Sequence, residues 1–152
     1  MQFSFEIVGT GWARASVGEG DSEVELTASY LSDALGDLLE AIGSLLEGGD
    51  AARCSWEEEP GEYRWVFTRD GAEVHLSILV FPDNFPPMRD DEGVEIFRIS
   101  EPLIDLAASV GDAAQRVLDD YGEAEYLRRW VEAPFPTAHL KMIREMLASH
   151  PR

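Results

Sequence analysis

The first feature of this sequence that could support chemistry is a group of acids without basic neighbours. Between Arg14 and Arg53 the chain holds nine acids and no lysine or arginine. Like charges spaced four residues apart on a helix destabilise it by about 0.2–0.5 kcal/mol per pair. Because nothing nearby compensates this repulsion, we predict an acidic surface that binds a basic partner. Its central residues share the polar face of a predicted helix: Asp33, Asp37, Glu40 and Glu47.

A second candidate site is a polar cluster on the open face of a predicted three-stranded unit. Asp70-Gly71 favours a two-residue hairpin turn, and Pro60-Gly61 is expected to connect the preceding strand to this hairpin. A carboxylate, a guanidinium and an imidazole on a rigid sheet could bind an anion or perform acid–base chemistry. The alternative is a solvated face, on which each cross-strand pair contributes about 0.2–1 kcal/mol. The cluster consists of Glu57, Arg64, Glu73 and His75, with Glu57 opposite Arg64.

The turn at Asp70-Gly71 also predicts the register of this hairpin, starting with Arg69 opposite Ala72. The opposite face of the hairpin is then aromatic and suited to a core. Its predicted pairs are Phe67 with Val74, Trp65 with Leu76, and Tyr63 with Ile78.

The motifs of common enzymes are absent from the sequence. It contains no nucleophile elbow, zinc-binding HExxH helix, phosphate-binding loop or CxxC pair. Cys54 is the only cysteine, which excludes an intrachain disulfide. The three histidines (His75, His139 and His150) are not at metal-ligand spacing. These observations favour a non-catalytic protein with no cofactor and no metal, and leave a minor enzyme as the alternative.

Composition indicates one soluble α+β domain over residues 1–152. The chain is 45% hydrophobic, which is enough for a core, and its net charge of −18 would repel nucleic acid and anionic membranes. No apolar run is long enough to cross a bilayer, and the first residues lack signal-peptide character, so we expect a cytoplasmic protein. The simpler explanation of the acidity is solubility alone.

Hydrophobic periodicity predicts one antiparallel sheet of six to seven strands with helices on one face, in the order β-β-β-α-β-β-β-β-α-α-α. The first helix is expected to begin at Leu31, and Ser100 or Glu101 to cap the second. The predicted strands cover residues 2–7, 12–17, 24–28, 52–57, 62–69, 72–81 and 94–99. The predicted helices cover residues 31–46, 102–121, 126–131 and 138–147.

A proline-rich connection over residues 82–93 completes the outline. Its three prolines predict a stiff loop that displays Phe85 and Met88 above the polar cluster. Free sheet edges and the Pro134-Phe135-Pro136 segment would also permit a homodimer.

In length, acidity and order of elements, the chain resembles small acidic bacterial α+β proteins of unknown function. In outline it resembles immunity proteins that neutralise toxin domains. The resemblance implies a protein-interaction module with a protein partner. The competing hypothesis is a small-molecule-binding domain or minor enzyme that uses the polar cluster.

Overall fold

The computed structural model describes residues 1–150, which form seven strands, one short 3₁₀ turn and three α-helices. Within this range no helix is long and apolar enough to span a membrane. In chain order the elements are β1 (Gln2–Ile7), β2 (Trp12–Glu19), β3 (Ser22–Ser29), α1 (Ala34–Leu46), β4 (Ala51–Glu57), β5 (Glu62–Asp70), β6 (Glu73–Phe81), η1 (Asp90–Glu92), β7 (Val94–Pro102), α2 (Leu103–Trp130) and α3 (Thr137–Ser149).

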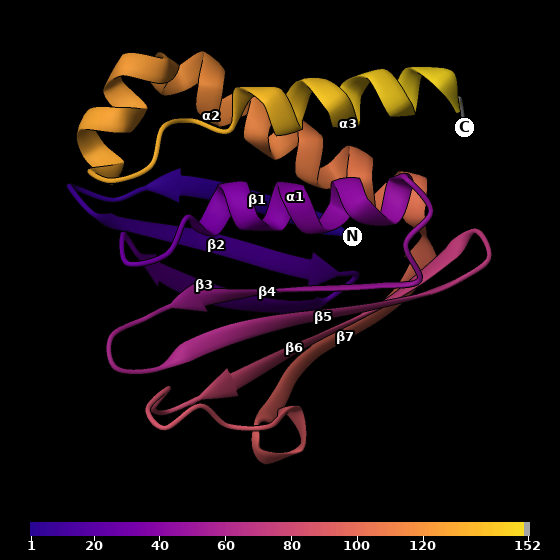
Figure 1. Cartoon of the computed structure of the whole chain (residues 1–152), viewed down its shortest axis with the longest axis horizontal. Coiled ribbons are helices and arrows are strands. Elements are labelled where there is room, and N and C mark those ends of the chain that lie inside the picture. Colours follow the sequence, from indigo (N-terminus) through magenta and orange to yellow (C-terminus); the bar gives the residue numbers. More distant parts are fainter. Residues whose placement is uncertain (151–152) are drawn as a thin grey trace.

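The strands form two antiparallel sheets, so the prediction of a single sheet is wrong. One sheet has the order β1-β2-β3 and the other β4-β5-β6-β7 (Figure 1). Side chains join β3 and its flanking residues to β4: Thr27 Oγ1 donates to Glu58 at 2.7 Å, and the Glu57 amide donates to Ser32 Oγ at 3.1 Å. Alternating polarity predicts which face of a strand is buried. It does not specify which strands pair through backbone hydrogen bonds, and so it could not show that β3 and β4 belong to separate sheets.

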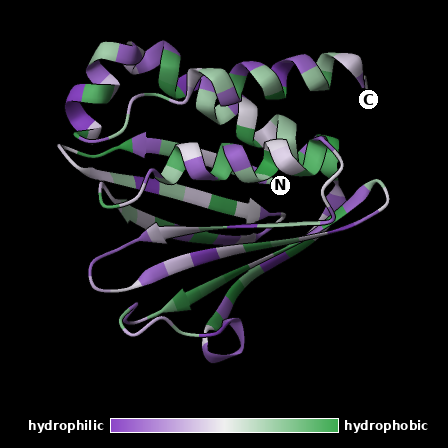
Figure 2. Ribbon diagram, in the orientation of Figure 1, coloured by the Kyte–Doolittle hydropathy of each residue, from purple (hydrophilic) through white to green (hydrophobic). Residues whose placement is uncertain are grey.

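The helices lie together on one side of the sheets (Figure 1). Helix α1 connects the two sheets and packs against β4, α2 lies beside β1, and α3 packs against both other helices. Hydrophobic and hydrophilic residues alternate along the helices in Figure 2, as expected when each helix buries one stripe.

The end of the second helix at Gly122 is confirmed, whereas its start differs from the prediction. Gly122 has φ 72° and ψ 167°, which are not helical, so α2 consists of two helical segments that meet at a kink. A left-handed φ of this kind favours glycine, and the chain continues into another helical turn. Ser100 and Glu101 lie in β7 instead of capping α2, which begins directly after Pro102.

The hairpin between β5 and β6 is shifted by two residues from the predicted register. Asp70 pairs with Glu73, so Gly71 and Ala72 form the turn, and Gly71 adopts φ 63°. Because side chains alternate with period two, a two-residue shift changes the partners without exchanging the faces. Trp65 is therefore buried on the predicted face, opposite Ile78.

Aromatic side chains from both sheets meet in the core. Trp56 and Trp65 have ring centroids 5.0 Å apart. Phe3 packs edge-on against Trp65 at 5.9 Å, and Phe5 against Trp56 at 5.8 Å. Edge-to-face pairs at these distances stabilise a fold by about 0.5–1.5 kcal/mol each beyond area burial. The four rings therefore connect the three-stranded sheet to the four-stranded sheet.

We expect Phe5→Leu to lower the free energy of unfolding by about 1–3 kcal/mol, since it removes the contact with Trp56 and leaves a cavity. Urea denaturation followed by tryptophan fluorescence would measure the change. Phe85→Leu is the matched control because Phe85 is 83% exposed. Equal destabilisation by the two substitutions would contradict this description of the core.

Candidate functional site

Helix α1 carries the acidic surface, and local sequence explains both the helix and its orientation. The Asp33 carboxylate accepts a hydrogen bond from the Gly36 amide at 3.3 Å and caps the helix. The helix therefore begins at Ala34 instead of Leu31, which is 52% exposed. Its apolar stripe is buried and consists of Leu35, Leu38, Leu39, Ile42 and Leu45.

The four predicted acids lie along α1 at spacings of four, three and seven residues, which place them on one side of the helix. Within residues 1–150, no ion pair involves Asp33, Asp37, Glu40 or Glu47. Glu47 forms the C-terminal cap, where the helix dipole disfavours a negative charge. Glu25, one of the nine acids counted above, does have a partner in Arg14 at 3.4 Å.

Burial and mutual repulsion raise the pKa values of two of these carboxyl groups, Asp37 and Asp33. Burial, followed by repulsion from Asp33 and Glu40, raises the pKa of Asp37 to about 6. Burial also raises the pKa of Asp33, although the Gly36 amide and His139 oppose this rise. His139 belongs to α3, so the acidic site includes a group from an element more than ninety residues away in the sequence.

A groove of about 380 Å³ runs beside this acidic surface, between α1 and β4. Asp37 and Glu40 line one side, and Arg53 and Cys54 line the other. The Arg53 guanidinium already donates to Asp90. Burial raises the pKa of the Cys54 thiol far above its ordinary value, so the thiol stays protonated and is a poor nucleophile. The groove therefore presents free negative charge without an activated nucleophile.

The structure does not bring the predicted polar cluster together. Arg64 pairs with Leu79 of β6, whereas His75 lies four residues earlier on β6, a separation of about 13 Å along a strand. Glu73 lies beside the hairpin turn, opposite Asp70. Glu57 faces Glu62 instead of Arg64, because residues 58–61 make a four-residue connection where two were expected.

Glu57 nevertheless has a defined environment at this end of the sheet. Burial and then repulsion from Glu62 raise its pKa, while a hydrogen bond from the Asn84 side chain opposes the rise. Glu57 therefore belongs with the loop after β6 and not with His75.

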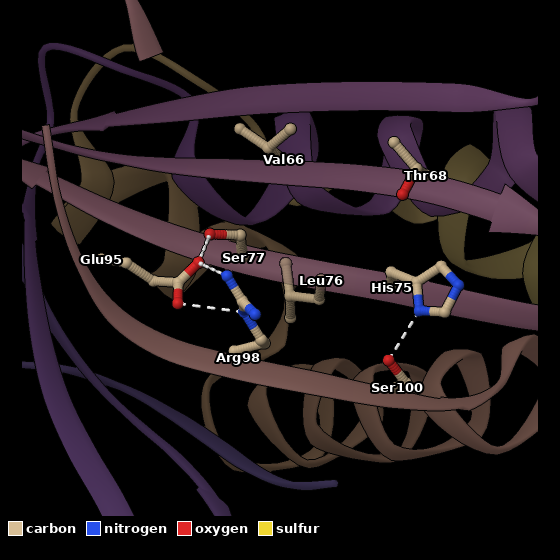
Figure 3. A pocket seen from close by; sticks show the side chains of 8 residues that line it. All are labelled: Val66, Thr68, His75, Leu76, Ser77, Glu95, Arg98 and Ser100. Carbon is tan, nitrogen blue, oxygen red and sulfur yellow. Dashed lines mark hydrogen bonds and ion pairs between the residues drawn. The ribbon is translucent and has the colours of Figure 1, made fainter. Parts of the chain in front are cut away.

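A shallow groove of about 300 Å³ lies on the open face of β5, β6 and β7 (Figure 3). His75 Nδ1 lies 2.6 Å from Ser100 Oγ, and Ser77 Oγ donates to Glu95 at 2.6 Å. Figure 3 shows these side chains paired with one another across neighbouring strands. Among residues 1–150, no carboxylate is hydrogen-bonded to His75, so the Ser–His contact lacks the third group of a catalytic triad.

Sequence reasoning missed Ser100 and Glu95 in this groove. Ser100 was expected to cap a helix, and the pairing of β7 with β6 had not been predicted. The alternation of exposed residues along β7 was the one signal that could have placed Ser100 on the open face of a strand.

Arg64 anchors the loop instead of facing a ligand. It is only 7% exposed and donates to Glu62 at 2.9 Å, to Asp90 at 2.8 Å and to the Met88 carbonyl at 2.8 Å. Its guanidinium carbon lies 4.1 Å from the centroid of the Phe81 ring. Although burial alone would raise the pKa of Asp90, hydrogen bonds from Arg64 and Arg53 outweigh it and hold that pKa below its ordinary value.

The loop over residues 82–93 is thereby tied to the sheet. Phe85 is exposed and Met88 is half-buried. Within residues 1–150, no group of three or more His, Cys, Asp or Glu side chains is arranged to hold a metal ion.

Comparison with known proteins supplies no family. No protein-family model matches the chain, and no curated protein is significantly similar to it. A similar solved structure is described as "CdiA-CT/CdiI toxin and immunity complex from Enterobacter cloacae". The matched chain has a TM-score of 0.48 and 15% sequence identity, and the match covers 74% of this chain and 97% of that one. A similarity this weak assigns neither a function nor a site residue.

We expect the contribution of Asp37 to the free energy of unfolding to fall as the pH rises from about 4 to about 6. The pKa of Asp37 is higher in the folded state, which therefore binds more protons than the unfolded state in this range. Asp37→Asn should raise the free energy of unfolding above pH 6 by less than about 1 kcal/mol, because solvent screens the site. The gain should disappear near pH 4.

Carbon-detected NMR titration of the Asp37 carboxyl group would measure this pKa directly. In Glu40→Gln the value should move down towards 3.8, because one repelling charge is removed. A titration of Asp37 near 4 in the wild type would contradict the proposed crowding.

We expect Arg64→Met to lower the free energy of unfolding by about 3–5 kcal/mol, since it leaves the buried Glu62 carboxylate unpaired. Urea denaturation would measure the loss, and Arg64→Met combined with Glu62→Gln should recover much of it. Arg98→Met is the matched control, because the Arg98 side chain is 76% exposed and pairs with Glu95 at the surface. That control should change stability by less than about 1 kcal/mol.

Proposed function

We propose that this protein is a non-catalytic interaction module whose α1 acids bind a basic surface on a partner protein. The observation that carries the proposal is that Asp33, Asp37 and Glu40 lie together on one side of α1. Burial, and then repulsion from Asp33 and Glu40, raises the pKa of Asp37 to about 6. Among residues 1–150, the folded protein holds these charges against mutual repulsion without an ion pair. A toxin domain neutralised by an immunity protein is the kind of basic partner that this surface would suit.

Binding a cation would relieve the repulsion. A lysine or arginine beside Asp37 would favour its charged form and lower its pKa. Relief of the repulsion among the α1 carboxylates would therefore contribute to the binding free energy. The groove between α1 and β4 is lined by Asp37 and Glu40, beside which a long basic side chain could lie. Charge complementarity of this type acts most strongly on the rate of encounter.

The net charge of the whole molecule also favours a basic protein partner. With 30 acids and 12 basic residues, its field attracts a basic protein from a distance set by the Debye length, about 8 Å at physiological salt. Several arginines are already paired with acids in the folded structure, as Arg144 is with Asp112 and Arg14 is with Glu6. The α1 acids are thus a concentrated part of the unpaired negative charge.

We expect the association rate with the partner to fall about 10-fold or more between about 50 mM and about 500 mM salt. The partner would be captured from the native host with the tagged full chain, identified by mass spectrometry and produced separately. Stopped-flow mixing would then give the association rate at each salt concentration.

Charge variants test whether the α1 acids cause the salt dependence of the association rate. Combining Asp33→Asn, Asp37→Asn and Glu40→Gln should slow association about 10-fold at low salt and flatten its salt dependence. Asparagine at position 33 keeps a side chain able to cap α1. The control combines Asp120→Asn, Glu132→Gln and Glu145→Gln, which removes the same charge from exposed positions of α2, its C-terminal flank and α3. Equal slowing by both triple variants, or rates indifferent to salt, would refute the assignment to α1.

A further inference from the structure

The connection between β6 and β7 is held in place by the buried Arg64 side chain. Arg64 bonds to the loop through the Met88 carbonyl and through Asp90, and it bonds to the sheet through Glu62. The loop also crosses tightly over Phe81, because a Cβ atom added at Gly93 would lie 2.6 Å from the Phe81 ring. Charged hydrogen bonds and close packing therefore hold this twelve-residue connection against the sheet.

Phe85 points outward from this anchored loop. It is 83% exposed, the highest value among the large hydrophobic side chains that are exposed. The residues beside it are held in place: the Phe85 amide donates to Asp83 Oδ1 at 3.2 Å, and the Asn84 side chain donates to Glu57. An exposed aromatic on an ordered loop, with no neighbouring core to enter, has the character of a binding hot spot.

The surroundings of Phe85 are strongly acidic. Residues 57–62 contain four glutamates and no basic residue, and residues 82–93 contain four acids and one arginine. Figure 1 shows both connections at the same end of the four-stranded sheet, and the Asn84–Glu57 bond joins them. Arginines pair with four of these eight acids, and within residues 1–150 no ion pair involves the other four: Glu57, Glu58, Glu59 and Asp83. Phe85 is therefore an apolar projection within a region that stays negatively charged after this pairing.

We propose that Phe85 is an anchor that inserts into an apolar pocket rimmed by lysine or arginine on a protein partner. This inference rests on the proposed function, because it assumes a basic partner, and it adds a second contact surface to α1. An anionic membrane is disfavoured because the surrounding carboxylates would repel its headgroups. A second copy of the chain is disfavoured because each copy carries a net charge of −18.

The two surfaces should affect different steps of binding. Acids on α1 steer the encounter, whereas a buried aromatic anchor slows dissociation. We expect Phe85→Ala to speed dissociation roughly 30-fold or more while leaving the salt dependence of association unchanged. Phe85→Trp should retain slow dissociation, and Leu127→Ala, which truncates another exposed side chain, should behave as the wild type.

Photocrosslinking identifies what Phe85 contacts. The photoreactive residue p-benzoylphenylalanine would replace Phe85, or Leu127 as a control, in the full chain expressed in the native host. An adduct from position 85 with the basic protein captured by the wild type, absent from position 127, supports the inference. An adduct with a second copy, with lipid, or with no protein overturns it.

Kinetics with the purified partner separate this inference from the proposed function. If Phe85→Ala dissociates like the wild type while the α1 triple variant associates slowly, the anchor is refuted and the acidic α1 surface stands. If the α1 variant matches its control while Phe85→Ala dissociates rapidly, the anchor stands and the role of α1 is refuted. Unchanged far-UV circular dichroism and urea midpoints for each variant would confirm that folding is intact.

Discussion

The contact between aromatic rings of the two sheets is the interaction on which the rest of the structure depends. Trp56 and Trp65 come from the four-stranded sheet, and Phe3 and Phe5 approach them from the three-stranded sheet. Among residues 1–150 no strand of one sheet pairs with a strand of the other, so side-chain contacts must hold the two sheets together. Trp130 extends this contact to α2 and donates its indole N–H to the Ser32 carbonyl at 3.1 Å. The same packing orients the start of α1, whose N-cap residue Asp33 follows Ser32.

The distribution of charge follows from this arrangement. Arg64 supports the β6–β7 loop from beneath, and Arg129 pairs with Glu125 on α2. These arginines are committed to internal contacts. Among residues 1–150 the α1 acids have no ion pair. Near Phe85 the acids outnumber the arginines that pair with them, which are Arg53, Arg64 and Arg89. Both proposed binding surfaces thus keep an excess of negative charge.

Several features of the fold could be predicted because their causes are local. The alternation in β5 and β6 identified the buried faces even though the turn, and hence the register, was displaced by two residues. The predicted pairing of Glu57 with Arg64 was wrong, because the register depends on the length of the 58–61 connection, which places Glu57 opposite Glu62. Likewise, the polarity of β7 did not show that Ser100 would lie beside His75, because that contact depends on the pairing of β7 with β6.

The sequence by itself determined the spacing of acids along α1, the period of its buried leucines and the alternation of the strands. These properties depend on helical and strand geometry over a few residues. Only the tertiary structure decided that the strands divide into two sheets, that Arg64 is buried under the loop, and that His139 lies near Asp37. Each of these results requires segments distant in the chain to pack together. Their packing depends on shape and on competing contacts that no local pattern records.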